Sequence, residues 1–194
     1  MAVLYIKREV DLLWGIWKME NSPGQGKRDS ERIAVNSLLT ELCGEEKLIL
    51  HHESGQPYLS DHSYRISISH TGGYAAVVLH PSLDVGIDIE KIGEKVQRVR
   101  HKFLQPEEDA NIVNGENEIV HLLLHWSAKE TVYKVMGQED VELKSHLCVS
   151  PFIPEEQGAF AVRELKTGTL QRFSVKYIVH PDFVLTYTIA DFQK

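Results

Sequence analysis

Two carboxylates lie in a short apolar run near the middle of the chain, Gly86-Ile87-Asp88-Ile89-Glu90. Side chains in a strand alternate in direction, so Asp88 and Glu90 would share the face of Gly86 while the isoleucines enter the core. The carboxylates would then stand about 7 Å apart, and anions held this close repel one another unless a cation lies between them. Oxygen ligands without a nearby histidine or thiol suit Mg²⁺. Alone, such a strand is also typical of solvated surface.

A second polar group follows on a segment with helical spacing, Trp126-Ser127-Ala128-Lys129-Glu130-Thr131-Val132-Tyr133-Lys134. Glu130 and Lys134 are four residues apart and face the same way, with Trp126 one turn earlier. An exposed Glu–Lys pair would contribute only about 0.3–0.5 kcal/mol. The tryptophan indicates partial burial, however, and burying charges without a task is costly. We expect Glu130 to complete the metal shell, and Lys129 and Lys134 to hold phosphate oxygens as point charges. Together the motifs indicate phosphoryl transfer.

Charge is distributed unevenly along the chain. The net charge of −7 argues against bulk binding to nucleic acid or to an anionic membrane surface. From Lys91 to Lys102, however, cations far outnumber acids: Lys91, Lys95, Arg98, Arg100 and Lys102 against Glu94. This basic patch suggests docking of an acidic partner, and the alternative is a solvated helix face.

Length and composition bound the class of protein. The chain has 194 residues, enough for one large domain or two small ones, and its 42% apolar and 25% charged content is ordinary for a globular protein. No apolar run reaches the length of a membrane span, and the N-terminus lacks the order of a signal peptide. Cys43 and Cys148 lie far apart, so a disulfide framework is not expected. These features predict a cytoplasmic protein.

The order of expected elements is the same in both halves. A strand, a helix and a hairpin are expected at Ala2–Lys7, Ser30–Cys43 and Arg65–Leu79, and again at Val85–Glu90, Glu118–Met136 and Ser174–Ile189. Ser30 is the expected N-cap of the first helix, and Gly44 is expected to end it. We therefore predict an α+β fold of two similar lobes, residues 1–83 and 84–194. Each lobe would pack a small antiparallel sheet against a long helix around a pseudo-twofold axis, with the site in the cleft between them.

The two motifs resemble the signature of the 4′-phosphopantetheinyl transferase superfamily, in its long, single-chain, pseudodimeric (surfactin-synthetase-activating) branch. Three further segments are similar to family elements in the same order. Gly55-Gln56-Pro57 resembles a Gly-Lys-Pro segment near the adenine end of coenzyme A, and Ser67-Ile68-Ser69-His70-Thr71 resembles an Asn-Ile-Ser-His-Ser hairpin whose histidine contacts the 3′-phosphate. Phe103-Leu104-Gln105-Pro106-Glu107 resembles a Phe-x-x-x-Glu element. Arg32 stands where the family often has an arginine for the same phosphate.

The resemblance implies an activity. It is transfer of 4′-phosphopantetheine from coenzyme A to a serine of an acyl or peptidyl carrier protein, as in fatty acid biosynthesis, with release of 3′,5′-ADP. Carriers are acidic, so the basic patch would be the docking surface, and one chain with two lobes would suffice as a monomer. The implied site residues are Asp88, Glu90 and Glu130 for Mg²⁺; Glu130, or a water that it positions, as base; Lys134, helped by Lys129, for charge stabilisation; Arg32, Gln56, Pro57, Ser69 and His70 for coenzyme A; and Glu107 in support.

The chain departs from the family pattern at three places. Gln56 replaces the usual lysine and Ser67 the usual asparagine, which would change the affinity for coenzyme A. The stretch after Lys134 is more acidic than the usual Gly-x-Gly. Two other classes of function stay open at this point. One is a catalytically idle relative that binds coenzyme A or a carrier, and the other is a metal-dependent hydrolase of nucleotide pyrophosphates.

Overall fold

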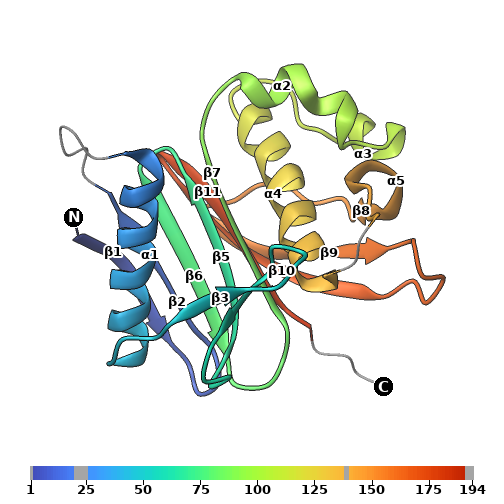
Figure 1. The fold of residues 1–194 in the computed structure, drawn as a ribbon. Helices are drawn as coiled ribbons and strands as arrows, with labels where there is room; N and C mark the ends of the chain where they lie inside the picture. Colours follow the sequence, from blue (N-terminus) through green and yellow to red (C-terminus); the bar gives the residue numbers. More distant parts are fainter. Residues whose placement is uncertain (1, 20–25, 138–139, 191–194) are drawn as a thin grey trace.

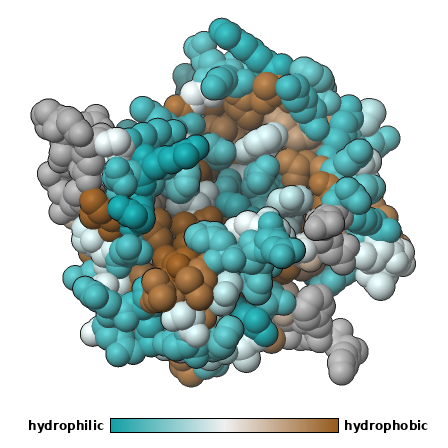
Figure 2. All heavy atoms as spheres, viewed as in Figure 1, coloured by the Kyte–Doolittle hydropathy of each residue, from teal (hydrophilic) through white to brown (hydrophobic). Residues whose placement is uncertain are grey.

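The computed structural model describes residues 2–19, 26–137 and 140–190. It has the predicted α+β architecture, in which two antiparallel sheets face each other and each carries one long helix on its outer face (Figure 1). Hydrophilic side chains cover much of the surface in this view, and hydrophobic residues gather in patches between them (Figure 2). The turn residues of Asn21–Gly26 predict a loop, and most of this segment lies outside the described residues. None of the described helices is long and apolar enough to cross a membrane.

The first sheet has the strand order β1-β2-β6-β5 and is covered by helix α1. Its elements are β1 (Ala2–Arg8), β2 (Leu13–Lys18), α1 (Lys27–Cys43), β5 (Arg65–Thr71) and β6 (Tyr74–His80). A two-stranded ribbon, β3 (Ile49–His51) with β4 (Pro57–Leu59), lies beside β5. The predicted N-cap is wrong, because α1 begins three residues before Ser30 and follows Gly26. The helix ends as expected at Gly44, where φ is +77°.

The second sheet has the order β7-β11-β10-β9-β8. Its strands are β7 (Val85–Lys91), β8 (Leu147–Val149), β9 (Gln157–Glu164), β10 (Arg172–His180) and β11 (Phe183–Ile189). Helix α4 (Glu118–Met136), which has the predicted bounds, covers this sheet. The short helices are α2 (Lys95–Val99), η1 (Arg100–Lys102), α3 (Pro106–Ala110) and α5 (Leu143–His146). The alternation of Phe183, Leu185, Tyr187 and Ile189 with other residues predicts a half-buried strand. Strand β11 is instead buried on both faces, because α4 covers one face and the first sheet the other.

A single apolar cluster joins the two sheets. It contains Trp14 and Ile16 from β2, packed with Ile87 and Ile89 from β7 and Leu185 from β11. The prediction that both isoleucines enter the core is confirmed, since they are 0% and 1% exposed. Burial of each is worth about 1.5–3 kcal/mol. The polar face of β7 therefore has to point toward α4.

One edge of β7 pairs with β11, and the other lies against β5. At that second edge, side-chain hydroxyls of β5 accept hydrogen bonds from amides of β7 that would otherwise pair with a further strand. We call these three side chains the hydroxyl ladder. Its bonds run from Ile87 N–H to Ser67 Oγ at 3.2 Å, from Ile89 N–H to Ser69 Oγ at 3.3 Å and from Lys91 N–H to Thr71 Oγ1 at 3.3 Å. The ladder thus connects the first sheet to β7.

Candidate active site

Helix α4 crosses β7 directly above Gly86. A Cβ atom at this position would lie only 2.2 Å from the carbonyl oxygen of Thr131 and 2.7 Å from Val135 Cγ2, so no other residue fits. A glycine lets another group approach the strand closely, and here the approaching group is the protein's own helix. The crossing brings Glu130 and Lys134 over the polar face of the strand.

Asp88 lies at the centre of this face and is 4% exposed. Its Oδ1 atom accepts hydrogen bonds from Ser69 Oγ at 2.9 Å and from Lys134 Nζ at 2.8 Å. Lys134 also donates to the carbonyl of Ile87 at 2.9 Å. The Oδ2 atom is buried and has no hydrogen-bond partner within the described ranges. A buried carboxylate oxygen without a partner is costly, so this atom is a natural ligand for a cation.

The two glutamates are both partly buried beside Asp88. Trp126 Nε1 donates to Glu90 Oε1 at 2.9 Å and fixes that side chain. Burial, followed by repulsion from Asp88, raises the pKa of Glu90. The same two causes, in the same order, raise the pKa of Glu130 to about 7, against the opposing charge of Lys134. The negative charge of Asp88 therefore acts on both glutamates.

We tested these residues as a Mg²⁺ site. No three His, Cys, Asp or Glu side chains in the described part of the chain are close enough together to form a metal cluster by themselves. Mg²⁺, however, is usually bound through one or two carboxylates together with water and substrate phosphates. The unpartnered oxygen of Asp88, the mutual repulsion of the carboxylates and the oxygen-only donor set all fit that ion. The residues present are thus suited to Mg²⁺.

Lys129 does not join this site, contrary to the expected phosphate contact. Its side chain is 0% exposed and its Nζ donates to Glu108 at 2.7 Å and to the carbonyl of Phe103 at 2.6 Å. Burial lowers its pKa, and Glu108 opposes that effect. The supporting carboxylate is therefore Glu108, and its neighbour Glu107 is exposed. The sequence signal that favours Glu108 over Glu107 is the capping box that Gln105 and Glu108 form at the start of α3.

The expected phosphate anchors of the first lobe lie near the start of α1. Arg32 is exposed and pairs with Asp29 at 3.2 Å. His70 is half-exposed, and its Nδ1 atom lies 3.3 Å from the carboxylate of Glu31. Sequence reasoning missed Glu31, because its contact depends on how α1 packs beside the hairpin. The structure thus gives each anchor an acidic neighbour.

Two adjoining cavities extend from Lys134 between the lobes. The smaller, of about 370 Å³, is lined by Lys134, Tyr133, Ser67 and the 54–57 turn. The larger, of about 650 Å³, shares Gln56, Pro57, Ile66 and Gly137 with it. Together they form a groove that begins at Lys134, whose Nζ donates to Asp88, and the three carboxylates themselves are not among its lining residues.

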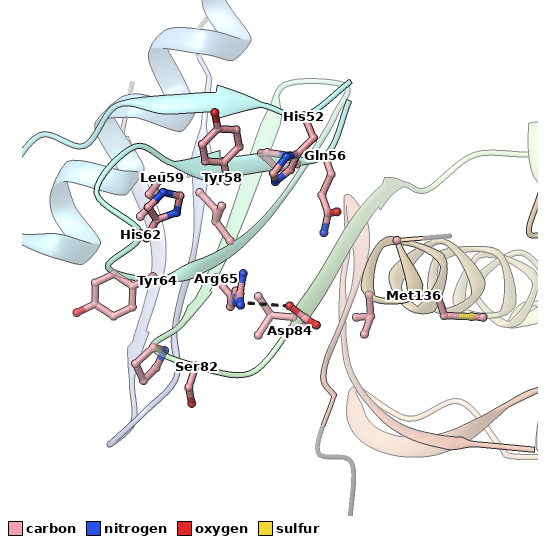
Figure 3. A pocket seen from close by; sticks show the side chains of 16 residues that line it. His52, Gln56, Tyr58, Leu59, His62, Tyr64, Arg65, Ser82, Asp84 and Met136 are labelled. Carbon is pink, nitrogen blue, oxygen red and sulfur yellow. Dashed lines mark ion pairs between the residues drawn. The ribbon is translucent and has the colours of Figure 1, made fainter. Parts of the chain in front are cut away.

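Polar and aromatic side chains line the larger cavity (Figure 3). The ring of Tyr58 stacks between His52 and His62, with centroid distances of 4.4 and 5.8 Å. Arg65 points toward Asp84 across the cavity, at 3.7 Å (Figure 3). This end of the groove can therefore hold a planar, polar group.

Four residues of the basic patch are exposed: Lys91, Lys95, Arg98 and Lys102. Arg100 differs from the expectation, because it is half-buried and pairs with Asp109 at 2.6 Å and Glu118 at 2.9 Å. It joins η1 to α3 and α4 and is not available as a free cation. Of the remaining four cations, Lys91 is the last residue of β7, and Lys95, Arg98 and Lys102 follow the strand.

The site combines acidic residues with a lysine at the edge of a groove between the lobes. Residues 84–188 match the family described as the 4′-phosphopantetheinyl transferase superfamily. The match covers more than half of the chain, and the chain belongs to this superfamily. Its members transfer phosphopantetheine, use coenzyme A with Mg²⁺, and act on carrier proteins. No curated protein matches the chain.

Proposed function

We propose that this protein transfers the 4′-phosphopantetheine group of coenzyme A to a serine of an acyl or peptidyl carrier protein. The serine oxygen would form a bond to the phosphorus of the pantetheine phosphate, while the bond to the bridging oxygen breaks and 3′,5′-ADP leaves. The observation that carries the proposal is the buried, unpartnered Oδ2 atom of Asp88 beside Lys134 at the start of an interlobe groove.

Each residue of the site has a proposed task. Asp88, Glu90 and Glu130 would hold Mg²⁺, which supplies charge neutralisation on the pyrophosphate when it is bound. Lys134 would stabilise the same charge from the groove side. Glu130, directly or through a water, would accept the serine proton.

The first lobe would bind the remote end of coenzyme A. Gln56 and Pro57 line both cavities and would contact the adenosine part. His70 and Arg32 would contact coenzyme A, and remote contacts of this kind orient the reacting end. Ser69, expected as a coenzyme A residue, would instead support the site by donating to Asp88. The proposed lobes are residues 1–83, on the 3′-phosphate side, and 84–194, on the metal side.

We also propose that the chain is of the single-chain pseudodimeric type and works as a monomer. The passage of the chain from the first sheet to the second between β6 and β7 supports the lobe boundary. The core shared by the two sheets supports assembly of one complete groove within one chain.

The carrier would dock on the exposed part of the basic patch, Lys91, Lys95, Arg98 and Lys102. Acidic carriers complement such a surface, and exposed charges act mainly on association. Charge reversal at Lys95 and Arg98 should raise KM for the carrier while the affinity for coenzyme A is unchanged. Reversal of the exposed Arg172 on β10 is the matched control. Unchanged carrier kinetics in the double variant would remove the docking surface.

The decisive experiment mixes the protein with Mg²⁺, coenzyme A and an apo-carrier and measures the carrier by mass spectrometry. We expect a gain of one phosphopantetheine, and loss of this product in Glu130→Gln. Full activity of that variant would contradict the metal and base assignment. Tight binding of coenzyme A without product would indicate an idle relative. Release of free phosphopantetheine without a carrier would indicate a hydrolase.

A further inference from the structure

The three hydroxyls of the ladder differ in the groups to which they donate their protons. Each of its oxygens accepts an amide from β7 and keeps one proton to donate. Ser69 gives that proton to Oδ1 of Asp88 at 2.9 Å. The side chain of Thr71 is a hydrogen-bonding neighbour of the Glu90 carboxylate. Ser69 therefore orients Asp88, and the proton of Thr71 is available to Glu90.

The third member, Ser67, has no acceptor for its proton within the part of the chain that the structure describes. Its oxygen accepts from Ile87 N–H at 3.2 Å, which turns the proton away from β7. Ser67 is only 4% exposed, and it lines the cavity of about 370 Å³. A hydroxyl in such a place is costly unless something in the cavity accepts from it.

Lys134 lies at the same cavity and is anchored to the same residue. Its Nζ donates to the carbonyl of Ile87, while the amide of Ile87 donates to Ser67. Both groups of one residue project from one edge of a strand, so the ammonium and the hydroxyl are held side by side. Together they form a pair of donors on the cavity wall, one charged and one neutral.

We propose that Ser67 is a substrate-binding residue, whose hydroxyl donates to a phosphate oxygen of coenzyme A held beside Lys134. This inference rests on the proposed function and adds a residue to its site. Hydroxyl donors bind anionic oxygens at short distances of about 2.5–2.7 Å, and such bonds are stronger than neutral ones. With this contact, all three hydroxyls of the ladder would have the same task. Each would donate its proton to a carboxylate of the site or to the substrate.

The test compares Ser67→Ala with Ser67→Thr, which keeps the hydroxyl. In Ser67→Ala we expect Kd and KM for coenzyme A to rise about tenfold, with kcat within about twofold. Ser67→Thr should stay within about threefold of the parent chain. Calorimetry with coenzyme A alone gives Kd, and the carrier assay gives KM and kcat. Ser67→Cys, which fills the space with a weak donor, serves if the alanine variant fails to fold, and it should also bind weakly.

A second comparison separates ligand contact from support of the lobe seam. Thr71→Val also removes a ladder hydroxyl from β7, but its proton serves Glu90. It should change the Mg²⁺ dependence and leave Kd for coenzyme A unchanged. Equal Kd values for the parent and Ser67→Ala, or equal weakening by Ser67→Ala and Thr71→Val, would overturn the inference. A parent chain that binds no coenzyme A would instead contradict the proposed function itself.

Discussion

The two lobes use the same strand-and-helix unit for different purposes. In β2 the run is Gly15-Ile16-Trp17, and in β7 it is Gly86-Ile87-Asp88. Each glycine lies under a helix: a Cβ atom at Gly15 would lie 2.9 Å from Leu38 of α1 and 2.8 Å from the carbonyl of Tyr5. Each isoleucine enters the core shared by the sheets. At the third position, Trp17 packs against the cluster under α1, whereas Asp88 carries the proposed chemistry.

The outer edges of these strands differ in a way that explains this division. The edge of β2 is filled by the backbone of β1, with Ile6 opposite Gly15. The edge of β7 is completed by the hydroxyl ladder and Lys134. A backbone partner leaves no donors for a ligand, whereas side chains that satisfy a strand keep further protons to donate. A strand edge whose backbone groups bond to side chains can therefore bind a ligand.

The sharpest test of this comparison substitutes the residue at the third position of each unit, Asp88 in β7 and Trp17 in β2. Asp88→Asn should lower kcat/KM by about 1,000-fold, because it removes the negative charge opposite the proposed metal and Lys134. Trp17→Phe is the matched change and should leave kcat/KM within about twofold. Steady-state transfer to a carrier measures both. Equal effects of the two variants would mean that the lobes do not divide the work as described.

The buried ion pair under α4 provides the next largest effect. Lys129→Met leaves Glu108 buried without its cation and should destabilise the fold by about 3–5 kcal/mol. The double variant Lys129→Met/Glu108→Gln removes both charges and should recover part of that loss. Urea unfolding measures each free energy. If Lys129→Met were as stable as the parent, Lys129 would again be a candidate phosphate ligand.

The two glycines should differ in their tolerance of a methyl group. Gly86→Ala meets a backbone carbonyl at 2.2 Å and should cost about 3 kcal/mol. Gly15→Ala meets a carbonyl at 2.8 Å and the flexible end of Leu38, and should cost about 1 kcal/mol. Unfolding free energies of both variants give the comparison. The reverse order would show that α1 lies closer to its sheet than α4.

Low pH should lower the stability of the second lobe, because its helix α4 contains two buried histidines whereas α1 contains none. Burial lowers the pKa of His121 to about 4 and that of His125 to about 3, so the folded chain keeps both neutral. The unfolded chain binds protons below its ordinary pKa of about 6.5, and stability therefore falls as pH drops below that value. Between pH 7.5 and 5 the loss from His121 alone is about 2 kcal/mol.

His121→Asn is the matched variant for this pH effect. It can keep an acceptor for the amide of Val113, which donates to His121 Nδ1 at 3.1 Å. It should lose less stability over the same pH range, as measured by thermal melts at each pH. An identical pH dependence in parent and variant would place the acid-sensitive group elsewhere.

The sequence predicted those features that depend on local periodicity. Strand alternation separated Asp88 from Ile87, and helical spacing paired Glu130 with Lys134. The bounds of α4 followed from its own pattern. These predictions needed no knowledge of how the lobes pack.

What the sequence could not predict depends on contacts across the fold. Lys129 and Lys134 look alike in a helical motif, and only the packing of α3 shows that Lys129 faces Glu108. The ladder connects residues twenty positions apart, so Ser67 read as a mere departure from the family pattern. Arg100 belonged to a charge run in the sequence, but its carboxylate partners come from α3 and α4.

The core between the sheets has a practical consequence for anyone who cuts this chain. A fragment that begins at β7 would contain the acidic strand and α4, but it would expose Ile87, Ile89 and Leu185 to water. Large exposed apolar faces of this kind drive aggregation. The lobes are therefore parts of one folding unit, and the second lobe needs the first as a solubilising partner even before any ligand binds.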